Sequence, residues 1–326
     1  MNPDPKSQDI VESMKSPAVS IIIAAFNSEK YIQRCVDSIA SQTMRDFEVI
    51  LIDDGSTDRT GQICEEYVQK DSRFHVFHQA NQGVAAARQK GLDLSQGEYT
   101  IHVDADDWIE PDMLKKMYES AEEESADMVI CDYIEHFRNG TRYNSQEPAP
   151  KDRLSIFGQM MNNLSGGLTN KLIRRSCYLQ YGITFDNDVH FEEDKLVCLK
   201  LLSHPISVSY IPVAFYHYDH TQNPLSLSNV GVFPDKRMLV LEKIEEYTNI
   251  KPVQQYFDNA IFYIAYQAFR TEKNDHFDFS SCFRRHLPSI RRAKGFPFYT
   301  KWLVLLRLHH IRIPYRHIKR ILSHDS

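Results

Sequence analysis

The sequence of 326 residues has no apolar run that approaches the roughly eighteen residues of a membrane span. Its first 16 residues are polar and lack the apolar core of a signal peptide, so we expect a disordered leader there. The six cysteines form no C-x-x-C pair and no metal-ligand spacing, which excludes the common zinc motifs. These absences predict a globular protein on the cytoplasmic side, with Cys35, Cys64 and Cys198 as reduced thiols in its core.

Charge is unevenly distributed along the chain. The net charge of the whole sequence is −6, but the segment from Arg284 onward contains eleven lysines and arginines against one acid, Asp325. That end therefore carries +10 and the remainder carries −16. The acidic body argues against nucleic acid as a partner, and the basic end requires an explanation of its own.

Apolar periodicity in residues 19–107 predicts alternating strands and helices. Short buried strands are expected at 19–25, 47–53, 74–77 and 99–103. The segments between them place apolar residues at helical spacing, and the connections are short. Such alternation builds an α/β fold, a Rossmann-like open and mostly parallel sheet with helices on both faces. The carboxyl ends of its strands meet at one edge, where folds of this class bind ligands.

The alternation is looser after Trp108. We expect helices at 111–124, at 156–164, before Gly182, after Asp194 and from Pro234 to about Arg270, and strands at 127–132, 207–211 and 215–218. Residues 133–138 either continue the strand 127–132 or pair with it. Residues 139–151 are predicted to form a loop, and 170–175 only to lead into the helix before Gly182.

Three carboxylates follow the fourth expected strand within four positions: Asp104, Asp106 and Asp107. Unpaired charges are costly to bury, so these acids are either solvated or neutralised by a cation. At a strand end that opens onto a ligand crevice, they suit a divalent cation that holds a phosphate. The alternative is an acidic turn that caps the helix after Pro111.

Four segments match a known family in order and in spacing: Val19–Ile32, Asp53–Asp58, Asn81–Arg88 and Asp104–Asp107. Together they resemble the inverting family 2 glycosyltransferases with a GT-A fold, of the bacterial surface-polysaccharide type. The resemblance covers roughly residues 19–225. It implies a nucleotide-sugar donor, usually a UDP-sugar, and a Mg²⁺ or Mn²⁺ cofactor. It also implies a nucleotide-sugar-binding half at 17–110 and an acceptor-binding half at 111–228.

The family's motifs assign nine residues to donor binding: Ala24, Phe26, Asn27, Asp53, Asp54, Gly83, Arg88, Asp104 and Ala105. Asp53 and Asp54 would contact the base and ribose, and Ala24 and Phe26 would form an apolar seat beneath the base. Arg88 would reach the diphosphate with its fork of donors. From the residues alone, one aspartate of the pair could cap a helix, Phe26 could belong to the core, and Arg88 could lie on the surface.

The resemblance also assigns the metal and the catalytic base. Asp104 and Asp106 would hold the metal. Asp194, with Glu193 as the second choice, would take a proton from the acceptor hydroxyl. Without the resemblance, acids at that position would be explained by the N-terminus of a helix.

Three further residues are placed around these acids. Many relatives carry an arginine where this chain has Asp219, so a phosphate contact is in doubt there, and His217 or His220 could act as a metal or phosphate ligand instead. An ordinary buried or surface histidine is the alternative. Lys171 and Trp108 are expected on the acceptor side.

The C-terminal part is expected to form a helical annex at 229–283 and a basic amphipathic tail at 284–326. Aromatic and aliphatic residues alternate with Arg and Lys over 296–322, which suits the surface of an anionic membrane. A lipid-linked glycan acceptor would require such peripheral contact at the inner face of the membrane. The alternatives are a helix pair packed on the catalytic domain or a homodimer contact.

These observations favour an enzyme that adds a single sugar to a hydroxyl of a glycan acceptor. The membrane helices and the complete Gln-x-x-Arg-Trp motif of processive members are missing from the sequence. A nucleotidyltransferase is the second interpretation, but Phe26–Glu29 lacks the glycine-rich basic loop expected after its first strand. A nucleotide-sugar-binding protein without turnover is the third, and the intact acids Asp104 and Asp194 argue against it.

Overall fold

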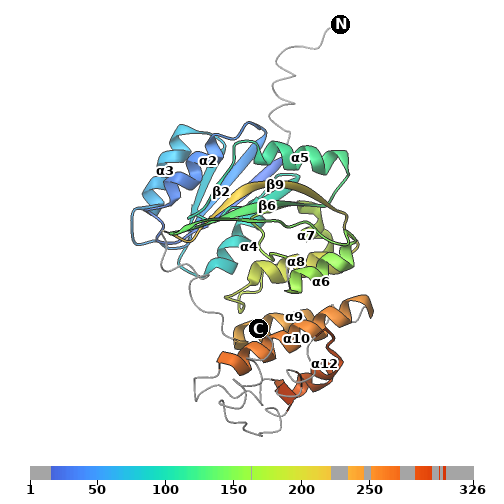
Figure 1. Cartoon of the computed structure of the whole chain (residues 1–326). Coiled ribbons are helices and arrows are strands. Elements are labelled where there is room, and N and C mark those ends of the chain that lie inside the picture. Colours follow the sequence, from blue (N-terminus) through green and yellow to red (C-terminus); the bar gives the residue numbers. More distant parts are fainter. Residues whose placement is uncertain are drawn as a thin grey trace. The chain divides into compact units, whose positions relative to one another are not determined.

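The computed structural model describes residues 16–162, 164–221, 234–245, 251–271, 283–295, 301 and 304–305. The chain divides into two compact units, one of residues 1–156 and 164–230, the other of residues 157–163 and 231–326. The first unit contains a sheet flanked by helices, and the described part of the second is helical (Figure 1). The candidate site lies in the first unit.

In the described part of the first unit, nine strands form one sheet. Its first half is parallel, in the order β3 (Phe74–His78), β2 (Phe47–Asp53), β1 (Val19–Ala25) and β4 (Tyr99–His102). The order continues through β8 (Lys171–Arg174), β6 (Met128–Phe137), β9 (Val208–Asp219) and β5 (Trp108–Ile109), and β7 (Gly140–Asn144) pairs with β6. Only β6 and β9 are parallel in this second half, which is therefore mixed.

Helices cover both faces of the sheet (Figure 1). One face carries α2 (Ile32–Ala40), α3 (Thr60–Lys70) and α5 (Met113–Glu123), and the other carries α4 (Val84–Leu94), α7 (Arg175–Tyr181) and α8 (Glu193–Ser203). Side chains of a strand alternate between the two faces, so both sets in β1 and β2 are buried. This explains why the two strands are continuous apolar runs rather than alternating ones.

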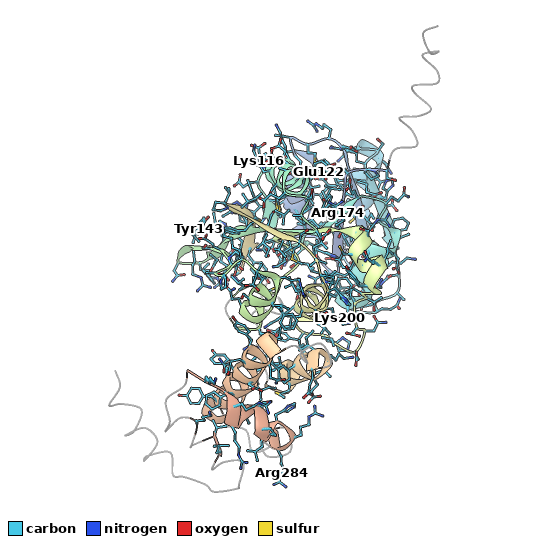
Figure 2. The ribbon with its side chains drawn as sticks, turned by 90° about the vertical axis from the view of Figure 1, so that its right-hand side faces the viewer. Lys116, Glu122, Tyr143, Arg174, Lys200 and Arg284 are labelled. Carbon is cyan, nitrogen blue, oxygen red and sulfur yellow. The ribbon has the colours of Figure 1, made fainter. Side chains whose placement is uncertain are left out.

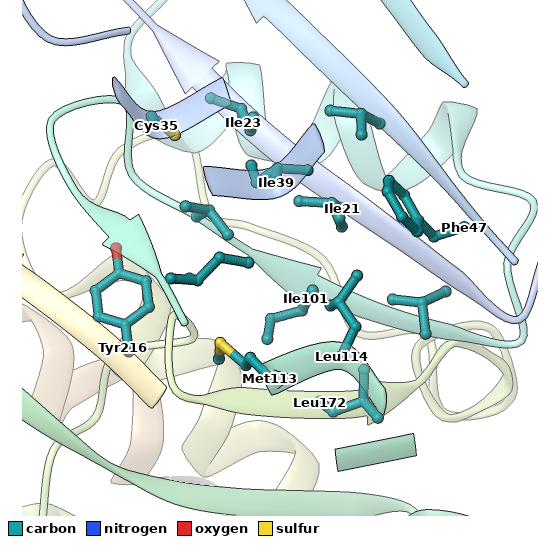
Figure 3. Packing of buried hydrophobic residues seen from close by; sticks show 14 of the residues in the cluster. Ile21, Ile23, Cys35, Ile39, Phe47, Ile101, Met113, Leu114, Leu172 and Tyr216 are labelled. Atoms are coloured by element: carbon teal, nitrogen blue, oxygen red, sulfur yellow. The ribbon is translucent and has the colours of Figure 1, made fainter. Parts of the chain in front are cut away.

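The larger core lies between the sheet and helices α2, α3 and α5. Ile21 and Ile23 of β1 pack there with Cys35 and Ile39 of α2, all with no exposed surface (Figure 3). Tyr216 of β9 belongs to the same cluster and is 1% exposed. A phenolic side chain in this position brings one hydroxyl into an apolar layer, and that hydroxyl needs a partner.

The parallel half confirms the predicted alternation, with β1 and β2 at the expected bounds. The second half corrects several expectations. The expected strand 127–132 continues through the following residues as one strand, β6 (Met128–Phe137). The expected strands 207–211 and 215–218 likewise fall in one strand, β9 (Val208–Asp219), and the β6–β9 register shifts between Cys131 and Tyr133. The predicted loop 139–151 contains β7, whose first four residues are exposed and so carry no burial pattern. Residues 171–174 form β8, which is too short for its periodicity to be recognised.

The second unit contains α9 (Pro234–Ile244), α10 (Lys251–Thr271), a 3₁₀ turn η2 (Arg284–His286) and α12 (Leu287–Arg292). Helix α6 (Arg153–Asn162) contributes residues to both units. The leader 1–15 and nearly all of 296–322 fall outside the described residues. Among the described helices, none combines the length and apolar character needed to cross a bilayer. Cys35, Cys64 and Cys198 are buried free thiols, as predicted.

Candidate active site

Hydrogen bonds between loops hold the carboxyl ends of β1 and β2 together. Asn27 Oδ1 accepts from Thr57 N at 2.9 Å, and Asn27 N donates to Ser56 Oγ at 3.0 Å. Asn27 has a φ of +49°, in the left-handed region that asparagine tolerates better than most residues. Asn27 therefore stabilises the loop after β2 through these hydrogen bonds. Its neighbour Phe26 exposes 49% of its surface and so is not a core residue.

Asp54 fixes the next loop in the same way. Its Oδ1 accepts from Gln79 Nε2 at 2.8 Å and from Gln82 N at 2.9 Å, and its Oδ2 accepts from Gly83 N at 2.8 Å. Gly83 has a φ of +89°, which favours glycine, and directly precedes α4. With 3% of its surface exposed, Asp54 is engaged by the protein itself. It positions the loop at the start of α4 instead of offering a free carboxylate to a nucleoside.

Asp53 is bound on one side by a histidine. His78 Nδ1 lies 2.8 Å from Asp53 Oδ2, and His78 Nε2 lies 3.0 Å from Glu65 Oε1. The hydrogen bonds to Asp53 and Glu65 raise the pKa of His78 above its usual value. The other carboxylate oxygen, Asp53 Oδ1, accepts from Ser56 N at 3.1 Å. His78 thus orients an acid that the sequence assigns to donor binding.

The three acids after β4 have three different environments. Asp104 keeps 27% of its side chain exposed and pairs with Arg88 at 2.7 Å. Asp106 is half-buried. Asp107 is 1% exposed, and its carboxylate accepts from Tyr216 Oη at 2.5 Å and from Asp219 N at 2.8 Å. Burial, together with the charges of Asp106 and Asp104, raises the pKa of Asp107.

Asp107 is therefore a structural acid of this loop. Tyr216 joins two of its parts, because its hydroxyl also accepts from Asp104 N at 3.2 Å. Ala105, which was expected to contact the donor, is 6% exposed and packs in the core. Asp104 and Asp106 are the two less buried acids of this loop. The alternative interpretation, an acidic turn that caps the following helix, is not what the structure shows, because Asp107 accepts from Tyr216 and Asp219 N and, among the described residues, the first turn of α5 has no side-chain cap.

His217 and Trp108 form part of an aromatic cluster beside these acids. The rings of Trp108 and His217 are stacked at 4.9 Å and 4°, and His136 lies 4.6 Å from the indole. His217 Nε2 lies 2.7 Å from Glu110 Oε1, and its Nδ1 lies 2.9 Å from His136 Nε2. Both ring nitrogens of His217 are taken by protein groups, so the structure does not bring it to the acids as a metal ligand.

Arg34 of α2 covers the same indole. Its guanidinium carbon lies 4.1 Å from the Trp108 ring centroid, and the group donates to Asp106 O at 2.5 Å and pairs with Asp219 at 2.8 Å. Trp108 is therefore engaged by Arg34 and two histidines and acts as a support of the acidic loop. Asp219, which stands where many relatives have an arginine, has its own arginine partner from a different element. His220 lies 3.0 Å from Glu135 and away from the site.

Arg88 of α4 joins the acidic loop to α8. Its two terminal nitrogens bind Asp104 Oδ1 and Glu193 Oε1, and its side chain is only 8% exposed. Burial acts against the charged form, but the carboxylates of Asp104, Glu193 and Asp194 outweigh it and raise the pKa of Arg88. Arg88 is thus neither a surface residue nor, in this state, a free diphosphate ligand. It brings together the predicted donor acid and the predicted catalytic pair.

Glu193 and Asp194 begin α8, directly after Glu192, whose φ of +56° is unusual for a non-glycine residue. Burial raises the pKa of Glu193 to about 7, with Arg88 opposing and Asp194 supporting the rise. Burial also raises the pKa of Asp194, opposed by Arg88 and supported by Asp104. A carboxylate with a raised pKa holds a proton more strongly, which is the property required of a general base.

Lys171 does not face an open acceptor site. It is 1% exposed, and its ammonium donates to Ser165 O, Gly167 O and Asn170 Oδ1 at 2.6–3.0 Å. The loop that it closes lies beside Asp194, because a methyl group on Gly167 would lie 3.5 Å from Asp194 Oδ2. Lys171 therefore shapes the surroundings of Asp194 from behind.

Asp104 and Asp106 fit a hard divalent cation only in part. Carboxylate oxygens are the correct donors for Mg²⁺ or Mn²⁺. Among the described residues, no group of three or more His, Cys, Asp or Glu side chains could hold a metal alone. Magnesium commonly binds through one or two carboxylates, with waters and substrate phosphates completing its shell. Two carboxylates at this strand end fit a cation that arrives with the donor.

Three residues of this site have no signal in the sequence taken alone. Tyr216, Arg34 and His78 act through contacts with acids that lie 109, 72 and 25 positions away. Arg34 and Tyr216 lie in segments that periodicity assigns to a helix and a strand, and His78 directly follows an expected strand. Their roles follow only from how the elements pack.

Sequence comparison identifies the family. The family model described as Glycosyl transferase family 2 matches residues 20–182. The chain is 34% identical to the glycosyltransferase EpsH of Bacillus subtilis over 72% of this chain and 73% of EpsH. It is 30% identical to TuaG of the same organism, named for teichuronic acid biosynthesis, over 75% of this chain and 96% of TuaG.

Structural comparison finds the same fold. Residues 1–349 of TarS of S. aureus in complex with UDP-GlcNAc superpose with a TM-score of 0.72 at 24% identity, covering 90% of this chain and 87% of that one. A mannosyltransferase of Pyrobaculum calidifontis, in complex with GDP-Man and Mn²⁺, gives 0.54 at 15% identity over 95% and 85%. The predicted GT-A fold is thus confirmed, and the chain belongs to glycosyl transferase family 2 and is a glycosyltransferase.

Proposed function

We propose that this glycosyltransferase inverts the anomeric centre as it moves one sugar from a UDP-sugar to a hydroxyl of a lipid-linked glycan. Its place would be the inner face of the membrane, in the synthesis of a cell-surface polysaccharide. The observation that carries the proposal is the double ion pair of Arg88 with Asp104 and Glu193. It joins the acid at the donor side to the acidic pair at the start of α8.

In this mechanism Asp194 removes the proton from the acceptor hydroxyl. The acceptor oxygen forms a bond to the anomeric carbon as the bond to the diphosphate oxygen breaks, and the electron pair leaves with the nucleoside diphosphate. Attack from the side opposite the leaving group gives inversion. The raised pKa of Asp194 favours proton uptake, and Arg88 keeps the neighbouring Glu193 in place.

The donor would be held by the strand-end loops of the parallel half. Asp53, oriented by His78, is the acid best placed to accept from the base or ribose, and the exposed Phe26 offers an apolar surface. Asp54 and Asn27 act indirectly by fixing these loops. A Mg²⁺ or Mn²⁺ held by Asp104 and Asp106 would neutralise the charge that develops on the departing diphosphate.

The choice of substrate class draws on the relatives. TarS was crystallised with UDP-GlcNAc, which supports a UDP-sugar donor, and the name of TuaG concerns a cell-wall polysaccharide. The mannosyltransferase complex with Mn²⁺ supports a divalent metal. The basic composition of 296–322 supports an acceptor at an anionic membrane.

The test is nucleoside diphosphate release from a panel of UDP-, GDP- and dTDP-sugars, with Mn²⁺ or Mg²⁺ and with EDTA. We expect release from a UDP-sugar that requires the metal and is lost in Asp106→Ala. Release from a GDP- or dTDP-sugar alone would overturn the donor assignment. If no donor of the panel gives nucleoside diphosphate release and none binds in calorimetry, the catalytic proposal is overturned.

A further inference from the structure

The second unit contains a basic cavity that the proposed reaction does not use. Its volume is about 550 Å³. Its described lining comes from α10, from α12 and from the segment after α12. These residues are Gln254, Gln255, Asp258, Arg291, Arg292, Ala293, Lys294 and Lys301. Four of them are cationic at neutral pH and one is acidic. The lining therefore has a net charge of about +3.

The walls of this cavity are built by specific contacts. Arg292 makes two bonds of 2.8 Å to the carboxylate of Asp258, which is itself 2% exposed, and so joins α12 to α10. Lys301 donates to Arg291 O at 2.7 Å and to Ala293 O at 2.6 Å at the end of α12. These contacts neutralise the only acid among the described residues of the lining and fix the backbone of 291–293.

The remaining charge belongs to Arg291 and Lys294. Both are exposed, and neither has an ion-pair partner among the residues that the structure describes. Lys301 makes two bonds to carbonyl oxygens of described residues, and an ammonium group has three N–H donors. Isolated surface cations would be explained by solvation alone. Here Arg291, Lys294 and Lys301 line one cavity, and the acid of its described lining, Asp258, is already paired with Arg292.

We propose that this cavity binds a phosphate or diphosphate group. A guanidinium offers two parallel N–H donors that match two oxygens of one phosphate, and ammonium groups add charge without a directional requirement. Two or more negative charges would match the charge of the lining. The group can come from a free anion or from a phosphate ester of a lipid. The lipid source extends the proposed function to the diphosphate of a lipid-linked acceptor, whereas binding of the free anion does not depend on that function.

The first measurement is calorimetric titration of the full chain with inorganic pyrophosphate in EDTA, which removes metal-dependent binding at the donor site. We expect saturable binding that weakens at least tenfold in Arg291→Ser/Lys294→Ser. The matched control is Lys115→Ser/Lys116→Ser, which makes the same charge change on the exposed surface of α5 (Figure 2). No binding to the wild type, or equal binding to the cavity variant, would overturn the proposal.

The second measurement separates the two sources. Vesicles of phosphatidylcholine with phosphatidic acid, and vesicles of phosphatidylcholine alone, are floated with the three proteins. If only the cavity variant fails to float with the phosphatidic acid vesicles, the ligand is a lipid phosphate. If all three proteins float equally while the cavity variant no longer binds pyrophosphate, the ligand is a free anion. The cavity variant should release UDP at the same rate as the wild type. If the wild type itself releases no UDP, the proposed function is contradicted, but anion binding by the cavity is not.

Discussion

Acids held by contacts within the parallel half of the sheet and acids held by partners across its two halves are positioned over different sequence distances. Asp54 is held by Gln82 and Gly83, which are 28 and 29 residues away and belong to the next strand–helix connection. Glu193 is held by Arg88 across 105 residues, and Tyr216 holds Asp107 across 109. Within the parallel half, successive loops at one sheet edge fix one another. Across the two halves, Glu193 and Asp107 receive these partners only when elements that are distant in the sequence pack together.

Because of this difference, we expect substitutions of Arg88 and Tyr216 to destabilise the site more than substitutions on the donor side. A donor-side acid with several backbone donors loses only part of its environment when one contact is removed. Glu193 and Asp107 each depend on a single side chain from another part of the fold for a charged or hydroxyl donor. The predictions below test this contrast in order of decreasing effect.

Replacement of Arg88 by alanine should have the largest effect on stability. It leaves Asp104 and the buried Glu193 without their cation, and breaking a buried pair by removing one partner costs about 3 kcal/mol or more. Urea unfolding of Arg88→Ala and the wild type measures the difference. Arg142→Ala is the control, because Arg142 pairs with Glu135 from a side chain that is 63% exposed. Equal unfolding midpoints for both variants would contradict the importance of the Arg88 pairs.

Removal of the Tyr216 hydroxyl should have an intermediate effect. Tyr216→Phe leaves the buried Asp107 with one donor among the described residues, Asp219 N, and an unmade bond to a buried polar group costs about 1–3 kcal/mol. The control is Tyr143→Phe. Tyr143 also donates to a buried acid, Asp132, but that acid keeps Tyr210 and Gln146 N as donors. Thermal unfolding should show a larger loss for Tyr216→Phe, and the reverse order would argue against a structural role for Asp107.

The smallest effect is expected on the donor side, at His78. Its pKa is raised by Asp53 and Glu65, so its contribution to stability is fully present below the unfolded-state value of about 6.5 and is lost as the pH rises through the raised value. The pair is partly exposed and should contribute less than about 1 kcal/mol. Melting temperatures of the wild type and His78→Gln should therefore differ more at pH 5.5 than at pH 8.5. A difference that grows with pH would show that the pairing does not involve the imidazolium.

The contrast between the halves also determines what the sequence could predict. Four strands and three helices of the parallel half follow from apolar runs, because both faces of β1 and β2 are buried. The exposed β7, the four-residue β8 and the two-residue β5 carry no such pattern. The resemblance to the family located the acids of the motifs. It did not predict which of these acids are held by other protein groups. Asp54 and Asp107 differ from Asp53 and Asp104 in the partners that surround them, which neighbouring residues in the sequence do not reveal.

The central claim is that the acid at the start of α8 acts as the base of a glycosyl transfer whose donor is bound elsewhere in the site. The most direct test compares Asp194→Asn with the wild type in UDP release and in calorimetric affinity for the same UDP-sugar. Asp93→Asn, on the exposed side of α4, is the matched control. We expect the turnover of Asp194→Asn to fall by about 10²–10⁴-fold at nearly unchanged donor affinity, since a general base acts only on the reaction step. An Asp194→Asn enzyme with wild-type turnover, or one that loses turnover only because it no longer binds the donor, would contradict this assignment.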